Sequence, residues 1–199
     1  FSQASQLTTI PQLDFSSVED GQNLFYRTSI KKLPVLDFSN IQNCRSMFND
    51  SYSLEEIPFD FTSENINSVL YMFQNTNIKN SPYVQLINCT SVNYMYYGCF
   101  NLESIPLLDF TNITSVTNFI SSSYRLDNLT DLGGFKNFKV NMTLLRQCPN
   151  LTYESVMNVI NNLYDFRANG DESTTRTIKF NNNSKALLSE SDIAIATSK

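Results

Sequence analysis

The sequence contains no histidine, no tryptophan and only five glycines among its 199 residues. The absence of histidine excludes His-based catalytic triads, His-ligated metal sites and His acid–base chemistry. Because glycine is scarce while Asn and Ser are abundant, Asn and Ser are the expected turn residues. The chain also lacks a glycine-rich phosphate loop, a Cys-x-x-Cys pair and a nucleophile elbow. We therefore expect no catalytic residues, no cofactor and no enzymatic activity, and a carboxylate-only glycosidase is the least favoured alternative.

The chain also lacks an excess of positive charge and a long apolar run. Its 14 basic and 19 acidic residues give a net charge of −5, which makes nucleic acid an unfavourable partner. No stretch of 18 apolar residues is present, so we expect no membrane insertion within this piece. A signal peptide or anchor is expected outside it. With 41% hydrophobic residues, the chain can bury a core.

What the sequence does contain is an internal repeat. Five prolines lie 23 or 24 residues apart: Pro11, Pro34, Pro58, Pro82 and Pro106. Thr130 lies 24 residues after the last of them, in the same slot of the repeat. The phrase around the prolines recurs as Leu-x-x-Ile-Pro-x-Leu-Asp-Phe, as in 7–15 and 102–110. A repeat of this length predicts a stack of similar coils that share one core.

Each coil is expected to contain an extended segment followed by a short helical segment. Proline removes a backbone donor, so it marks the point where pairing between extended segments ends or bulges. After it, Ile41, Cys44, Met47 and Phe48 follow a helical period, and Ser39 lies where a helix N-cap would be. Ser16 and Thr111 hold the same position in other coils.

These patterns predict an α/β repeat, a leucine-rich-repeat solenoid of about six coils of 23–25 residues, over residues 1–150. Residues 151–199 break the period and are expected to form a capping segment packed on the solenoid. In it, Thr152 caps a helix whose apolar face includes Val156 and Ile160, a strand follows at 177–180, and a second helical stretch covers 184–199.

The four cysteines follow the phase of the repeat. Cys44 and Cys89 take slots that hold Val or Ile in other coils, while Cys99 takes the slot of Ser51, and Cys148 likewise precedes a leading Leu by three residues. We therefore expect buried free thiols rather than disulfides or a metal site.

Aspartates recur where the extended segment ends, at Asp14, Asp37, Asp60 and Asp109. A ladder of carboxylates can bind calcium. The favoured interpretation is that each accepts hydrogen bonds from the amides of the following turn, so no metal site is predicted.

A strip of charged residues is the first candidate for ligand contact. Its members are Lys31, Lys32, Glu55, Glu56, Lys79 and Glu103. Their alternating charges fit attractive pairs between adjacent strands, and each pair contributes roughly 0.2–1 kcal/mol. The same side chains could also face a ligand, and both roles can hold together.

Exposed tyrosines are the second candidate. They lie near the end of the helical segment of each coil: Tyr26, Tyr52, Tyr71, Tyr97 and Tyr124. Aromatic side chains at such positions act as recognition anchors, or they cover an edge of the core. The sequence leaves these two roles open.

The repeat phrase, followed by Met-Phe or Met-Tyr and then Cys as in 93–106, resembles the BspA-type leucine-rich repeats of bacterial surface proteins. The segment 151–163, running on to 194–197, resembles the ending of such proteins and of gut phage tail proteins. The resemblance implies a recognition or adhesion module on a cell surface or virion tail that binds a host protein or glycan. An architectural spacer without a ligand is the alternative, and the oligomeric state stays open.

Overall fold

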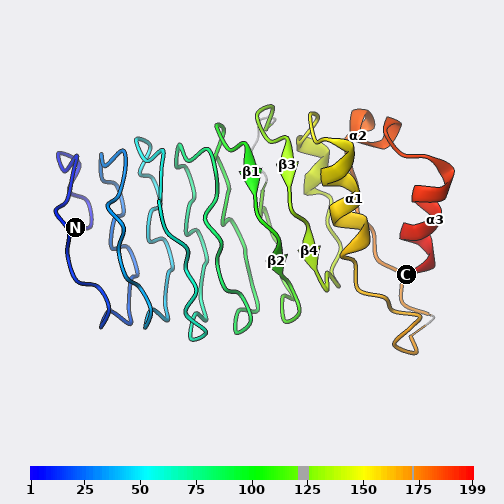
Figure 1. Cartoon of the computed structure of the whole chain (residues 1–199), viewed down its shortest axis with the longest axis horizontal. Helices are drawn as coiled ribbons and strands as arrows, with labels where there is room; N and C mark the ends of the chain where they lie inside the picture. The colour runs from blue at the N-terminus through cyan, green and yellow to red at the C-terminus, as the bar shows by residue number, and fades with distance from the viewer. Residues whose placement is uncertain (121–125, 172) are drawn as a thin grey trace.

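The computed structural model describes residues 1–120, 126–171 and 173–199. The chain is a mixed α/β structure with short parallel strands, few helices and an extensive buried aromatic core. Successive turns of the chain, here called coils, lie side by side along the long axis (Figure 1). The N-terminus lies at one end of this row, and the helices of the C-terminal segment lie at the other.

The regular elements are short and lie in the second half of the chain. They are β1 (Ser104–Ile105), β2 (Leu108–Asp109), β3 (Asp131–Leu132), β4 (Phe135–Lys136), the 3-10 helix η1 (Leu144–Gln147), α1 (Tyr153–Asn161), α2 (Asn182–Ala186) and α3 (Glu190–Ser198).

Parallel pairing joins each coil to the next. Strand β1 pairs with β3 and β2 with β4, and single parallel bridges join earlier coils, for example Lys32 to Glu56 and Asn80 to Ser104. Pro106 lies between β1 and β2, where the pairing is interrupted. The expectation that proline marks such an interruption is confirmed.

The prediction of a short helix in each coil is wrong, because no helix lies among the described residues before η1. In 44–50, alternate amides donate to the next coil, as in Ser46 N to Leu70 O at 2.8 Å, while the amides between them close tight turns, as in Met47 N to Cys44 O at 3.2 Å. Ser46 has a left-handed φ of 52°, which an α-helix does not allow. The apolar residues 41, 44, 47 and 48 are buried as predicted. A row of turns has thus produced the spacing of an amphipathic helix, and Ser16, Ser39 and Thr111 cap no helix.

The last repeat is out of the predicted phase. Ser104 pairs with Asp131, 27 residues later, so Gly133 rather than Thr130 lies opposite Pro106. A Cβ atom on Gly133 would lie 2.3 Å from the backbone nitrogen of Leu107. Only glycine therefore allows the two coils to approach this closely.

The core contains a ladder of aromatic rings that runs from coil to coil. The rings of Phe25 and Phe48 are nearly parallel with centroids 5.5 Å apart, and Phe73 and Tyr96 continue the stack at 5.7 and 5.5 Å. All four side chains are almost fully buried. Each stacked pair contributes roughly 0.5–1.5 kcal/mol beyond the burial of its area.

The C-terminal segment begins with the predicted helix. Thr152 is the N-cap of α1 and accepts a hydrogen bond from Ser155 N at 3.2 Å, and Val156 and Ile160 are buried. Ser155 Oγ in turn accepts a bond from Leu132 N at 2.8 Å, which joins α1 to β3. The N-cap prediction is confirmed.

The rest of the C-terminal segment differs from the prediction. The expected strand 177–180 is a single parallel bridge between Met142 and Ile178. The expected helical stretch 184–199 is divided into α2 and α3, because Ser189 and Asp192 form a capping box that starts a new helix. None of the helices in the described part of the chain has the length and hydropathy needed to cross a lipid bilayer.

Candidate binding surface

The charged strip forms a row of exposed side chains across consecutive coils. Glu55 N donates to Lys31 O at 2.8 Å, Lys79 N to Glu55 O at 3.4 Å, and Glu103 N to Lys79 O at 2.7 Å. The four residues therefore follow one another along the row with alternating charge. Their backbone atoms hold the row, and their side chains point into solvent.

The second members of these pairs include an ion pair. Lys32 Nζ lies 2.6 Å from Glu56 Oε1, with both side chains more than half exposed. Exposed pairs of this kind contribute only about 0–1 kcal/mol. The pairing supports the structural role of the strip, while a ligand role for these residues stays a prediction.

The predicted tyrosines fall into two groups, and Tyr124 lies outside the described residues. Tyr52 is 67% exposed, and its hydroxyl donates to Asp50, which also pairs with Arg27 at 3.2 Å. Partial burial, followed by the nearby charge of Asp50, raises the pKa of Tyr52. Tyr26 joins this group through Arg27, whose guanidinium lies 4.9 Å from the centre of the Tyr26 ring.

The second group, here called the tyrosine platform, consists of Arg45, Tyr71, Tyr94 and Tyr97. The rings of Tyr71 and Tyr94 are stacked with centroids 5.0 Å apart and an interplanar angle of 18°. The guanidinium carbon of Arg45 lies 5.2 Å from the centre of the Tyr71 ring, and Tyr97 contacts Tyr94 at 5.6 Å. All four side chains are partly exposed. The platform thus combines one guanidinium and three aromatic rings from three coils, with the Tyr97 ring tilted by 59° to that of Tyr94.

The backbone of the platform is unusual. Tyr71 and Tyr94 have φ angles of 59° and 60°, in the left-handed region that bulky residues rarely adopt. The equivalent position in neighbouring coils holds residues that tolerate this region better or are small: Asn23, Ser46 and Asn118. Two tyrosines are therefore held at a conformational cost that the fold itself does not require, which points to a role for their rings.

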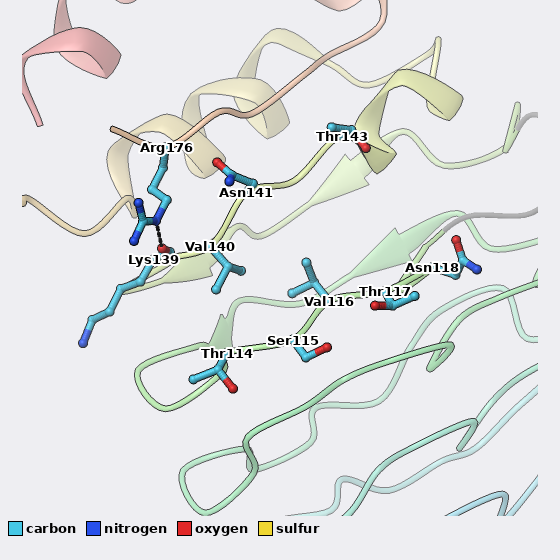
Figure 2. A pocket seen from close by; sticks show the side chains of 10 residues that line it. All are labelled: Thr114, Ser115, Val116, Thr117, Asn118, Lys139, Val140, Asn141, Thr143 and Arg176. Atoms are coloured by element: carbon cyan, nitrogen blue, oxygen red, sulfur yellow. Dashed lines mark hydrogen bonds between the residues drawn. The ribbon is translucent and has the colours of Figure 1, made fainter. Parts of the chain in front are cut away.

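A groove opens next to the platform, between segments 114–118 and 139–143 (Figure 2). It has a volume of about 580 Å³. Val116 and Val140 lie on opposite sides of it, and Arg176 lies beyond Lys139. The lining is otherwise made of hydroxyl and amide side chains: Thr114, Ser115, Thr117, Asn118, Asn141 and Thr143.

The platform and the groove are continuous along one row of the fold. Tyr94 N donates to Thr117 O at 3.0 Å, so the coil that carries the last platform residues is paired with the first wall of the groove. Asn118 holds the same left-handed position as Tyr71 and Tyr94, with φ of 50°. A single ligand could therefore contact both.

Two cations lie at the second wall of the groove. Arg176 Nε donates to Lys139 O at 2.7 Å, and its guanidinium carbon lies 5.3 Å from the centre of the Phe166 ring. Lys139 Nζ lies 4.4 Å from the centre of the Tyr164 ring. Within the described part of the chain, no carboxylate forms an ion pair with either side chain. The net negative protein therefore has a local positive site here.

The aspartates act mainly within turns. Asp14, Asp37 and Asp109 accept hydrogen bonds from the amides of Ser16, Ser39 and Thr111 at 2.8–2.9 Å. These bonds confirm the turn role. Asp60 instead accepts a bond from Tyr83 N in the next coil. No group of three or more potential metal ligands occurs among the described residues.

The four cysteines are free and buried, as predicted. Cys99 donates to Phe73 O at 3.0 Å, and Ser51 donates to the equivalent Phe25 O at 2.6 Å, so Cys99 does replace a serine. Burial raises the pKa of Cys99 to about 11 and that of Cys89 to about 12. These thiols are therefore neutral near pH 7 and poor nucleophiles.

Tyr94 and the groove were not predicted from the sequence. Tyr94 could have been found, because it shares its slot with Tyr71. The groove carries no such signal, since most of its lining residues are ordinary Thr, Ser and Asn, its second wall lies in the repeat that is out of the predicted phase, and the cation Arg176 comes from outside the repeats.

Comparison with known proteins places two overlapping stretches, residues 1–106 and 30–131, in a family described as "Mycoplasma protein of unknown function, DUF285". No curated protein and no solved structure matches the chain.

Proposed function

The chain belongs to the DUF285 family, described as a Mycoplasma protein family of unknown function, and we propose that it is a non-enzymatic recognition module. In this proposal the tyrosine platform contacts a protein or glycan of a host cell. The module is displayed on a cell surface or on a virion tail, as the resemblance to BspA-type proteins implies.

The proposal includes the architecture of the module. Residues 1–150 are a leucine-rich-repeat solenoid, and residues 151–199 are its C-terminal cap. Parallel bridges between residues 23–25 positions apart, such as Lys32 to Glu56 and Asn43 to Ser68, support this interpretation. Solenoids of this kind present extended surfaces for binding, because each repeat adds the same slots to a rigid row.

One observation carries the proposal, namely that Tyr71 and Tyr94 stack in a left-handed conformation. The left-handed region costs an L-residue with a Cβ roughly 1–2 kcal/mol, and Asn tolerates it best. Asn23 and Asn118 show that the fold accepts Asn at this slot. Tyrosine and arginine side chains are the residues most enriched in binding hot spots, because they supply a large rigid contact area.

The proposal is tested by applying the purified chain to arrays of host glycans and host surface proteins. The platform variants Tyr71→Asn and Tyr94→Asn are compared with Tyr52→Asn, which removes an exposed tyrosine from the other group. We expect the intact chain to bind a component of the array, the platform variants to lose about tenfold or more in affinity, and Tyr52→Asn to bind normally.

Circular dichroism of each variant shows that the fold is kept. If the intact chain binds nothing on either array, the recognition role falls, and the chain is an architectural spacer. If binding occurs but the platform variants keep full affinity, the platform is not the contact surface.

A further inference from the structure

We infer that the groove between 114–118 and 139–143 binds an extended acidic peptide segment, which adds as a strand between its two walls. The inference rests on the proposed recognition role and adds the chemical class of the ligand. It arises from a break in the backbone pairing between coils.

Backbone amides on this face of the molecule regularly donate to the next coil. Cys44 N bonds to Ser68 O at 2.8 Å, and Val92 N bonds to Ser115 O at 3.1 Å. By position, the amides of Val116 and Asn118 would continue the series. Segments 114–118 and 139–143 are both described, and no backbone hydrogen bond joins them. Within the described ranges, the first wall of the groove therefore has unpaired backbone amides, at Val116 and Asn118, where the other coils pair with the next one.

Among the described residues, the backbone of the second wall pairs with a neighbouring segment only on the side away from the groove. Met142 N bonds to Thr177 O at 2.8 Å, and Lys179 N bonds to Met142 O at 2.8 Å, so the segment 177–179 occupies the outer edge. The other edge of 139–143 faces the groove, and no described backbone segment pairs with it. Open edges of this kind are templates for an added strand, in which main-chain hydrogen bonds give affinity and side chains give specificity.

The side chains of the groove indicate what the added strand would contain. Alternate residues of a strand point to opposite faces, so alternate residues of the ligand would meet Val116 and Val140. These positions suit small apolar side chains. Lys139 and Arg176 lie side by side at one end of the groove and have no carboxylate partner among the described residues. They suit an acidic residue at that end of the ligand, and a peptide with an acidic residue at each end meets them in either strand direction.

The test uses fluorescence polarisation with an N-terminally labelled, C-terminally amidated peptide of sequence Asp-Val-Thr-Val-Asp. Two comparison peptides replace both Asp by Lys, or carry an N-methyl group on the central residue, which removes a main-chain donor. We expect saturable binding of the first peptide and a loss of about tenfold or more for the other two.

Protein variants place the site. Thr117→Trp fills the groove from an exposed position and should abolish binding, whereas Thr62→Trp, at an exposed position outside the groove, should not. Lys139→Glu should weaken binding, whereas Lys31→Glu makes the same change in net charge on the charged strip and should leave it unchanged.

Competition with polygalacturonate, an acidic polysaccharide, separates a peptide site from a glycan site. If the polysaccharide binds while the N-methylated and parent peptides bind equally, the groove recognises acidic sugars and the inference is overturned. It is also overturned if no peptide binds. Binding on the arrays that depends on Tyr71 and Tyr94 would then leave the recognition role standing. If instead the peptide binds and neither array gives a signal, the groove inference stands, while the proposed contact between the tyrosine platform and a host protein or glycan falls.

Discussion

The ring of Tyr71 lies nearly parallel to that of Tyr94 on the next coil, with centroids 5.0 Å apart, although both residues have left-handed backbones. The backbones of the two residues are positioned by inter-coil hydrogen bonds, such as Tyr71 N to Asn93 O and Tyr94 N to Thr117 O. The stack therefore depends on the register between coils.

We predict a favourable coupling between these two rings. In a double-mutant cycle with Tyr71→Asn and Tyr94→Asn, the free energies of unfolding should deviate from additivity by roughly 0.5–1.5 kcal/mol, because either substitution removes the stack. Urea denaturation of the four proteins measures this. The matched cycle of Tyr71→Asn with Tyr52→Asn should be additive within about 0.5 kcal/mol. Additive effects in the first cycle would show that the rings do not interact.

Gly133→Ala should lower the free energy of unfolding by roughly 2–3 kcal/mol, because the new Cβ atom would overlap backbone atoms of the preceding coil. The nearest of these is Leu107 N, at 2.3 Å. Gly170→Ala is the control, since Gly170 has a positive φ of 81° but open space around its Cβ position. Its cost should be limited to the backbone strain of about 1–2 kcal/mol. Chemical denaturation compares the two, and an equal cost would contradict the register of β1 with β3.

Replacement by serine should affect the free energy of unfolding differently at two of the buried cysteines. Cys99→Ser should change the free energy of unfolding by less than about 1 kcal/mol, because Ser51 already makes the equivalent bond to a carbonyl in the preceding coil. Cys44→Ser should cost roughly 1–3 kcal/mol, because it places a hydroxyl in a slot that holds Val92 and Val116 in later coils. Thermal unfolding of both variants is the measurement. A larger loss for Cys99→Ser than for Cys44→Ser would contradict this assignment of slots.

Asp109 should make stability depend on pH in the acid range. Partial burial acts to raise the pKa of Asp109, but hydrogen bonds from Thr111 and from Lys136 Nζ, at 3.1 Å, outweigh it and hold this pKa below its usual value. The ionised carboxylate therefore stabilises the fold above the unfolded pKa of about 3.9, and this stabilisation is lost as the pH falls through the lower folded value.

Asp109→Asn should consequently lower the free energy of unfolding at pH 7. The difference from the parent chain should shrink towards about pH 2–3, because the Asp109 carboxyl becomes protonated there. Urea unfolding at several pH values measures this difference. A difference that does not vary with pH would mean that the charge of Asp109 contributes nothing.

The sequence predicted the interior of each coil well and its backbone poorly. Ile41, Cys44, Met47 and Phe48 are buried as expected, but they are carried by turns rather than by a helix. Spacing at three and four residues reports which side chains point inward. The spacing does not indicate whether a backbone amide bonds within its own segment or to the neighbouring coil. In this chain the amides alternate between the two.

The sequence by itself determined the repeat, the buried thiols, the aspartate turns and the alternating charges of the strip, because each of these follows from one residue type in one slot. The tertiary structure decided which coils pair, that Gly133 rather than Thr130 lies opposite Pro106, and that the pairing opens between 114–118 and 139–143. It also placed Tyr71 against Tyr94 and Arg176 beside Lys139. These features depend on hydrogen bonds between segments far apart in the chain, whose register the local residue pattern does not encode.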